Sequence, residues 1–200
     1  MRGLILAVML ALPVAVAGQG LGDAASRERQ KRQAQPAKPV RAITQEQLDA
    51  AAAGRDAWTS PDGAFRIAFP GQPEVKDDSA RGTGITYRVA AGTSTFQVTV
   101  HRPLASQNDS ALMDGIRDTA LRSLNQASLI SENAVTTPRG VPGRQFLIGF
   151  STRNTGRQGV MRSRAYASGG RTYVVITMAE PGGENSADVV AFLDSFEVLK

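Results

Sequence analysis

Hydrophobic and polar residues alternate along much of the chain from residue 65 onward, which predicts a series of β-strands. Phe65, Ile67 and Phe69 alternate with Arg66 and Ala68, and one apolar face at a period of two residues is typical of a half-buried strand. The segments 85–89 and 96–100 repeat this pattern on either side of a turn over 91–93, which predicts a hairpin. Further strands are predicted near 130–137, 143–151, 159–167 and 171–179, with a short one over 197–199.

Two segments show the periodicity of amphipathic helices. The first begins at Asn108 or Asp109 and ends near Leu124, and the second begins at Asn185 or Ser186. Gly115 inside the first helix costs about 1 kcal/mol relative to alanine, so packing must stabilise that helix. Strand pairs separated by two helices predict an α+β fold, in which a mostly antiparallel sheet is flanked by helices. The apolar stripes comprise Leu112, Met113, Ile116, Ala120, Leu121 and Leu124 in the first helix, and Val189, Val190, Phe192, Leu193 and Phe196 at the second.

The first 17 residues have the features of a secretory signal peptide. Arg2 precedes an apolar run over 4–12, and Ala15-Val16-Ala17 is a small-x-small cleavage pattern. A transmembrane helix needs about 20 apolar residues, so cleavage after Ala17 is favoured over a retained anchor. We therefore expect a mature chain that begins at Gly18, is periplasmic or secreted, and does not span the membrane.

Residues 18–57 differ in composition from the rest of the chain. The stretch 18–43 is rich in Ala, Gln and Arg and has almost no large apolar residue, so it cannot offset its ordering entropy by burial. Thr44 and Gln47 form a capping-box pattern that predicts a short helix over 44–53. We interpret 18–57 as a flexible basic tether and 58–200 as the folded domain.

The residue types in the chain exclude several kinds of chemistry. Cysteine is absent, which removes disulfides, thiolate nucleophiles and a lipidated cysteine. The one histidine, His101, shares the polar face of its predicted strand with Gln97 and Thr99. It has no orienting acid or second ligand in the pattern, so we expect it to face solvent and to be dispensable. We predict a non-enzymatic protein with no catalytic, metal or cofactor site.

The charge balance gives little support for a nucleic-acid partner. The net charge is +5, but residues 58–200 carry fifteen basic and thirteen acidic side chains, a net of only +2. Seven arginines do lie between Glu132 and Glu180, with no acidic residue between those two.

The hairpin over 159–178 contains the one candidate binding surface. If Gly169-Gly170 is a two-residue turn, one face carries Met161, Ala165, Val174 and Ile176 and is predicted to be core. The opposite face carries the candidate partner-binding residues Arg162, Arg164, Tyr166 and Tyr173. Two interpretations explain this face. In the first, the aliphatic stems of the arginines cover the tyrosine rings and have no binding role; in the second, the face is a recognition surface. The first interpretation is favoured. Both interpretations leave the arginines exposed, so their charge reversal is expected to change partner binding more than folding.

Three segments resemble a known group of proteins. "WTSPDGAFRIAFPGQP", "VPGRQFLIGF" and "RTYVVITM" followed by "FLDSFEVL" are similar to bacterial PsbP-like domains, relatives of the extrinsic photosystem II subunit. The resemblance covers about residues 58–200. It implies an α/β/α sandwich and a role in binding or assembly. The matching motifs are structural, so no metal ligand and no photosynthetic role is implied.

Two functional hypotheses follow. The first is an exported, non-enzymatic binding or assembly module of the bacterial cell envelope with a protein partner. The second is an envelope-associated protein that binds anionic lipid or glycan through its tether and its Arg-rich strands. The pattern indicates no particular oligomeric state. An enzyme without familiar motifs would need a deep pocket with perturbed carboxylates.

Overall fold

The computed structural model describes residues 44, 56–82, 84–102 and 109–200, all within the unit Ile43–Lys200. The predicted signal peptide, its cleavage site, nearly all of the tether and the helix predicted over 44–53 lie outside the described residues.

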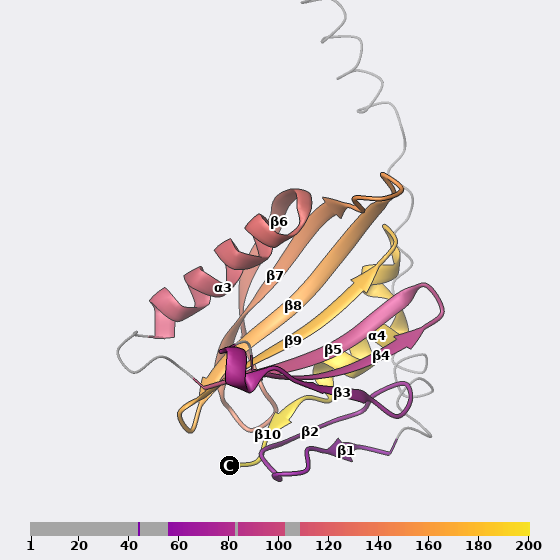
Figure 1. Ribbon diagram of the computed structural model, residues 1–200. Helices are drawn as coiled ribbons and strands as arrows, with labels where there is room; N and C mark the ends of the chain where they lie inside the picture. Colours follow the sequence, from indigo (N-terminus) through magenta and orange to yellow (C-terminus); the bar gives the residue numbers. More distant parts are fainter. Residues whose placement is uncertain (1–43, 45–55, 83, 103–108) are drawn as a thin grey trace, which may run out of the picture. The chain divides into compact units, whose positions relative to one another are not determined.

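The described chain forms two antiparallel sheets and two α-helices (Figure 1). In the larger sheet the strand order is β3-β4-β5-β9-β8-β7-β6, and in the smaller sheet it is β1-β2-β10. The strands are β1 (Trp58–Thr59), β2 (Phe65–Ile67), β3 (Glu74–Asp77), β4 (Ile85–Ala91), β5 (Ser94–His101), β6 (Asn125–Thr136), β7 (Pro142–Ser151), β8 (Gln158–Ser168), β9 (Arg171–Ala179) and β10 (Glu197–Val198). The helices are α3 (Asp109–Ser123) and α4 (Ala187–Asp194), with short 3-10 turns η1 (Ser79–Arg81) and η2 (Gly183–Asn185).

Helix α3 covers one face of the seven-stranded sheet, while α4 and the small sheet cover the other (Figure 1). The predicted α+β fold is thus confirmed, with β8 and β9 covered on both faces. Ser186 caps α4 as predicted, because its side chain accepts a hydrogen bond from the Val189 backbone N–H.

The register of the hairpin β8–β9 follows from its turn. Gly169 and Gly170 both have positive φ (58° and 68°), the backbone of a two-residue turn that matches strand twist. Ser168 pairs with Arg171, and each later rung follows the predicted pairing up to Met161 opposite Met178. The β4–β5 hairpin is confirmed as well, with Ala91 paired to Ser94.

Two apolar clusters form, one on each face of the large sheet. The main core joins the small sheet and α4 to strands β4, β5, β8 and β9, and its buried members include Phe65, Phe96, Tyr166, Tyr173, Phe192 and Phe196. The α3 core joins Met113 of α3 to Phe146 and Ile148 of β7 and to Met161 and Ala165 of β8. The prediction that the Met161 face packs in the interior is confirmed for these two β8 residues.

Strand β3 was not predicted and strand β6 begins earlier than predicted, and both lie at the edges of the large sheet. All four residues of β3 are exposed, so no alternation marks this strand. Strand β6 begins at Asn125, immediately after α3, rather than near residue 130. Gln126 there has a positive φ of 50°, a turn conformation that the hydrophobic pattern does not reveal. Most of β6 is exposed, as expected of an edge strand with irregular register.

Candidate ligand-binding cleft

Of the four candidate partner-binding residues, the two tyrosines are buried and the two arginines are partly buried. Tyr166 and Tyr173 are fully buried in the main core, and burial raises the pKa of both phenols. The face that carries Arg162, Arg164 and the two tyrosines is therefore the interior face under α4, which corrects the prediction of an exposed face.

Arg164 and Arg162 attach the segment 184–194 to β8. Arg164 Nη1 donates to the backbone oxygen of Leu193 at 2.9 Å, and its Nη2 lies 2.7 Å from an Asp194 carboxylate oxygen. Arg162 Nη1 donates to the Glu184 backbone oxygen and to Asn185 Oδ1. Burial and the neighbouring Arg164 charge lower the pKa of Arg162. The Arg164 bonds hold the C-terminal end of α4, where helix carbonyls need donors. The Arg162 bonds hold η2, which precedes α4, so both arginines have a structural role.

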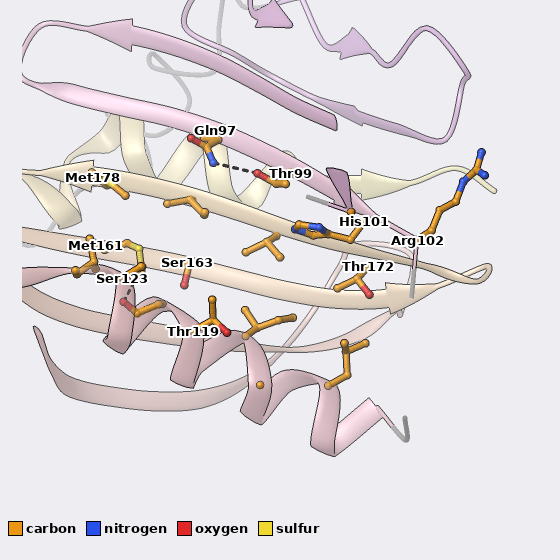
Figure 2. A pocket seen from close by; sticks show the side chains of 18 residues that line it. Gln97, Thr99, His101, Arg102, Thr119, Ser123, Met161, Ser163, Thr172 and Met178 are labelled. Carbon is orange, nitrogen blue, oxygen red and sulfur yellow. Dashed lines mark hydrogen bonds between the residues drawn. The ribbon is translucent and has the colours of Figure 1, made fainter. Parts of the chain in front are cut away.

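A hollow lies on the opposite face of the sheet. It is a cleft of about 600 Å³ between α3 and strands β5, β9 and β8 (Figure 2). This volume is within the range of small-molecule sites, about 300–1,000 Å³. Its residues are Gln97, Thr99 and His101 of β5, Leu112, Gly115, Ile116, Thr119, Ala120 and Ser123 of α3, Met161 and Ser163 of β8, Thr172, Val174, Ile176 and Met178 of β9, and Gly82, Arg102 and Leu124.

The pairing of β5 with β9 determines which side chains lie next to one another on the floor of the cleft. His101 pairs with Thr172, Thr99 with Val174, and Gln97 with Ile176, so a polar row on β5 runs beside a mainly apolar row on β9. Gln97 Nε2 donates to Thr99 Oγ1 at 3.0 Å (Figure 2). The polar side of β5, predicted to face solvent, thus lines one side of the cleft.

Helix α3 is fastened on the side away from β5. Arg144 Nη1 of β7 lies 2.7 Å from the Asp114 carboxylate and 2.8 Å from that of Glu132 on β6. Arg117 of α3 contacts Asp114 and Glu132 as well, at 3.2 Å. A network of this kind fixes position more than it adds stability, and it leaves the β5 side of α3 facing the cleft.

Gly115 lies where this helix faces the cleft. An added Cβ at Gly115 would meet no atom within 4 Å, so a side chain here would project into open space. A glycine in the middle of a helix is unfavourable, and the packing of α3 on the sheet offsets this cost as expected. Gly115 lines the cleft without a side chain that would occupy the open space beside it.

His101 is half-buried at one end of the cleft, which corrects the expectation that it faces solvent. No hydrogen bond or ion pair joins it to a described residue, and burial lowers its pKa. Gly84 lies against this part of β5: a Cβ added there would lie 2.2 Å from the Val100 backbone oxygen and 3.0 Å from His101 Nδ1, so only glycine fits at residue 84. That His101 is dispensable stays a prediction.

The depressed pKa of His101 predicts a pH dependence of stability. The unfolded chain binds a proton at a pKa of about 6.5, whereas the folded state favours the neutral imidazole. Folding stability should therefore fall as the pH drops through that value, and His101→Gln should lack this component. Urea unfolding at about pH 8 and about pH 5.5, on either side of the unfolded pKa, measures it. If wild type and variant lose the same stability on acidification, the imidazole is not desolvated as described.

The described residues contain no helix long and apolar enough to cross a membrane. They also contain no cluster of three or more side chains of the metal-ligating types.

The cleft was not predicted from the sequence, although signals for it exist. Hydroxyl and amide side chains on a strand whose other face is apolar, and a glycine within an amphipathic helix, were each explained locally. Only their alignment across β5, β9 and α3 shows that they surround one space.

Comparison with known proteins identifies the type of fold. No family model and no curated protein matches the chain. Among solved structures, cyanobacterial PsbP (CyanoP) from Synechocystis sp. PCC 6803 is similar at 12% identity and a TM-score of 0.50, over 72% of this chain and 92% of that chain. LpqN, described as involved in cell envelope biogenesis of Mycobacterium tuberculosis, is similar at 12% identity and a TM-score of 0.51, over 73% and 91% of the two chains. At these identities the likeness concerns the fold alone, and the chain has a PsbP-like α+β fold.

Proposed function

We propose that this protein is an exported, non-enzymatic binding module of the bacterial cell envelope, and that the cleft between α3 and the sheet is its ligand site. The observation that carries the proposal is the cleft itself. It is a preformed space of about 600 Å³ with apolar side chains and a few polar groups, the usual composition of small-molecule sites.

The chemistry of the lining favours binding over catalysis. Its titratable side chains are His101 and Arg102, and it contains no carboxylate, lysine or tyrosine. A general base needs a partner that orients it, and His101 has none among the described residues. The enzyme hypothesis required perturbed carboxylates in a pocket, and this cleft does not supply them.

Export rests on the signal-peptide pattern of residues 1–17. The similarity to LpqN, described as a cell-envelope biogenesis protein, is compatible with this location. The hypothesis of an anionic surface bound through Arg-rich strands has less support, because Arg162 and Arg164 are engaged by the segment 184–194.

Binding of a neutral apolar dye tests the site. We expect the fluorescence of N-phenyl-1-naphthylamine to rise on addition of the protein, because the dye leaves water for the apolar lining. Gly115→Phe should abolish this signal, since its ring would enter the open space beside α3. The matched control Gly115→Ala should keep the dye signal and stabilise the fold by about 1 kcal/mol.

The dye experiment also contains the result that contradicts the proposal. If Gly115→Phe folds with an unchanged circular dichroism spectrum and binds dye as wild type does, the cleft is not the site. A wild-type protein that gives no signal refutes a ligand-binding cleft altogether.

A further inference from the structure

The two ends of the cleft differ chemically (Figure 2). His101, Arg102 and Thr172 lie at one end, and Met161 and Met178 lie at the other. Four residues of β9 connect the ends, from Thr172 through Val174 and Ile176 to Met178. From Thr172 to Met178 the strand advances by six residues, which at the rise of about 3.3 Å per residue of a β-strand is a length of about 20 Å. The cleft is therefore an elongated space with a cationic side chain at one end, while Gln97 and Ser123 are the polar side chains toward the methionine end.

The end near Arg102 contains a hydroxyl group without a partner. Thr172 is 2% exposed, and its Oγ1 is buried with no hydrogen-bond partner among the described residues. An unsatisfied buried donor is rare and calls for a specific explanation. Thr172 lies directly opposite His101 in the register of β5 and β9. A ligand atom that accepts a hydrogen bond here would satisfy the hydroxyl.

The charge at this end selects an anion. Arg102 follows His101, is exposed, and makes no ion pair with a described residue, while the cleft lining holds no acidic side chain. Two carboxylates, Asp62 and Asp77, line an adjoining cavity of about 450 Å³ that shares His101 and Arg102. Both are already engaged, Asp62 by Arg171 and Asp77 by the Ser79 backbone N–H. Figure 2 shows the Arg102 side chain extending outward from this end, so its guanidinium is available at the rim of the cleft to pair with a ligand, and a guanidinium suits a carboxylate or a phosphate.

The other end of the cleft suits an alkyl chain. Ile176 and Leu124 join the two methionines there, beside the polar side chains of Gln97 and Ser123. Methionine side chains adapt their shape and favour apolar ligands of variable form. A volume of about 600 Å³ spread over a length of about 20 Å suits a single chain better than the paired chains of a bilayer lipid.

From this juxtaposition we propose that the cleft binds a single-chain anionic amphiphile, such as a fatty acid. Its head group lies at the end of the cleft near Arg102 and the Thr172 hydroxyl, and its chain lies along β9 toward Met161 and Met178. The inference rests on the proposed function and adds the class of ligand.

Displacement of the bound dye by myristate tests the inference, with myristate kept below its micellar concentration. We expect myristate to displace the dye, and its methyl ester, which has the same chain without the charge, to bind at least about tenfold more weakly, as expected for loss of a charge-assisted hydrogen bond. Arg102→Gln should weaken myristate binding by about tenfold and affect ester and dye binding much less. Thr172→Val should weaken myristate binding in the same direction. Arg153→Gln, at an exposed arginine outside the cleft, is the control and should change neither affinity.

The outcomes separate this inference from the proposed function. If the dye binds in a Gly115-dependent way but myristate and its ester bind equally, or Arg102→Gln has no effect, the site stands and the anionic head group is wrong. If myristate binds equally to wild type and Gly115→Phe, the amphiphile binds elsewhere and the inference falls. If neither dye nor myristate binds, the proposed function itself fails.

Discussion

The double variant Arg162→Glu/Arg164→Glu is expected to lose its folded structure. Both guanidiniums donate to one atom, Gln145 Oε1, at 3.1 and 3.0 Å. Arg164 also donates to the Leu193 backbone oxygen at the end of α4. Glutamate can donate to none of these oxygens.

The expected loss is large because several bonds disappear together. A hydrogen bond to a charged group contributes about 1.5–3 kcal/mol, and a buried acceptor left unpaired adds a desolvation cost. The Arg164 side chain is only 13% exposed, although its partner Asp194 is 55% exposed, so the ion pair itself is screened and contributes less. A new carboxylate would further face Asp194 and the negative end of the α4 dipole. Domains of this kind have about 5–15 kcal/mol of total stability, and the double reversal removes much of it.

Thermal unfolding followed by circular dichroism measures this effect. The matched control is Arg153→Glu/Arg157→Glu, which reverses the same number of charges in the exposed loop between β7 and β8. Exposed substitutions shift stability by less than about 0.5 kcal/mol each, so the control should melt close to wild type. If both double variants melt like wild type, the segment 184–194 does not pack on β8 as described.

This expectation reverses the one drawn from the sequence, and the reason is physical. Alternation along β8 and β9 indicates two faces and, with the glycine turn, the pairing of every rung. It does not indicate what covers each face, because the cover comes from α3 and α4, which are remote in the sequence. Arg164 was taken as exposed since charge usually means solvent, yet its acceptor is a backbone oxygen 29 residues away. Every residue has a backbone oxygen, so the residue types in a sequence do not show which one an arginine side chain will bind.

The cleft escaped prediction for a related reason. Period-two alternation placed Gln97, Thr99 and His101 together correctly on one side of β5, and helix periodicity placed Gly115 in α3. Whether such a face meets solvent or a gap depends on how far the helix stands from the sheet. That distance depends on Arg144 and its ion pairs with Asp114 and Glu132, which join three elements. The local patterns therefore predict the elements and their faces but not the space between them.

Phe196→Ala is expected to cause the largest loss of stability among apolar truncations on the side of the small sheet. Phe196 is 1% exposed and lies between α4 and β10. Its ring stacks on Tyr166 with centroids 5.3 Å apart and contacts Phe65 and Tyr173 at 5.7 Å. One side chain thus joins the small sheet to β8 and β9.

Truncation of a buried phenylalanine costs about 3–5 kcal/mol through lost burial and the cavity left behind, and the aromatic pairs add to this. Urea unfolding should therefore show a much lower midpoint with a similar slope, because stability changes while the surface exposed on unfolding does not. Phe196→Leu should recover part of the loss, since it fills part of the cavity without the ring contacts. Ile130→Ala is the control: Ile130 is 57% exposed on the edge strand β6, so its truncation should shift stability by less than about 0.5 kcal/mol. Equal midpoints for the Phe196 and Ile130 variants would mean that α4 and the small sheet do not share one core with the large sheet.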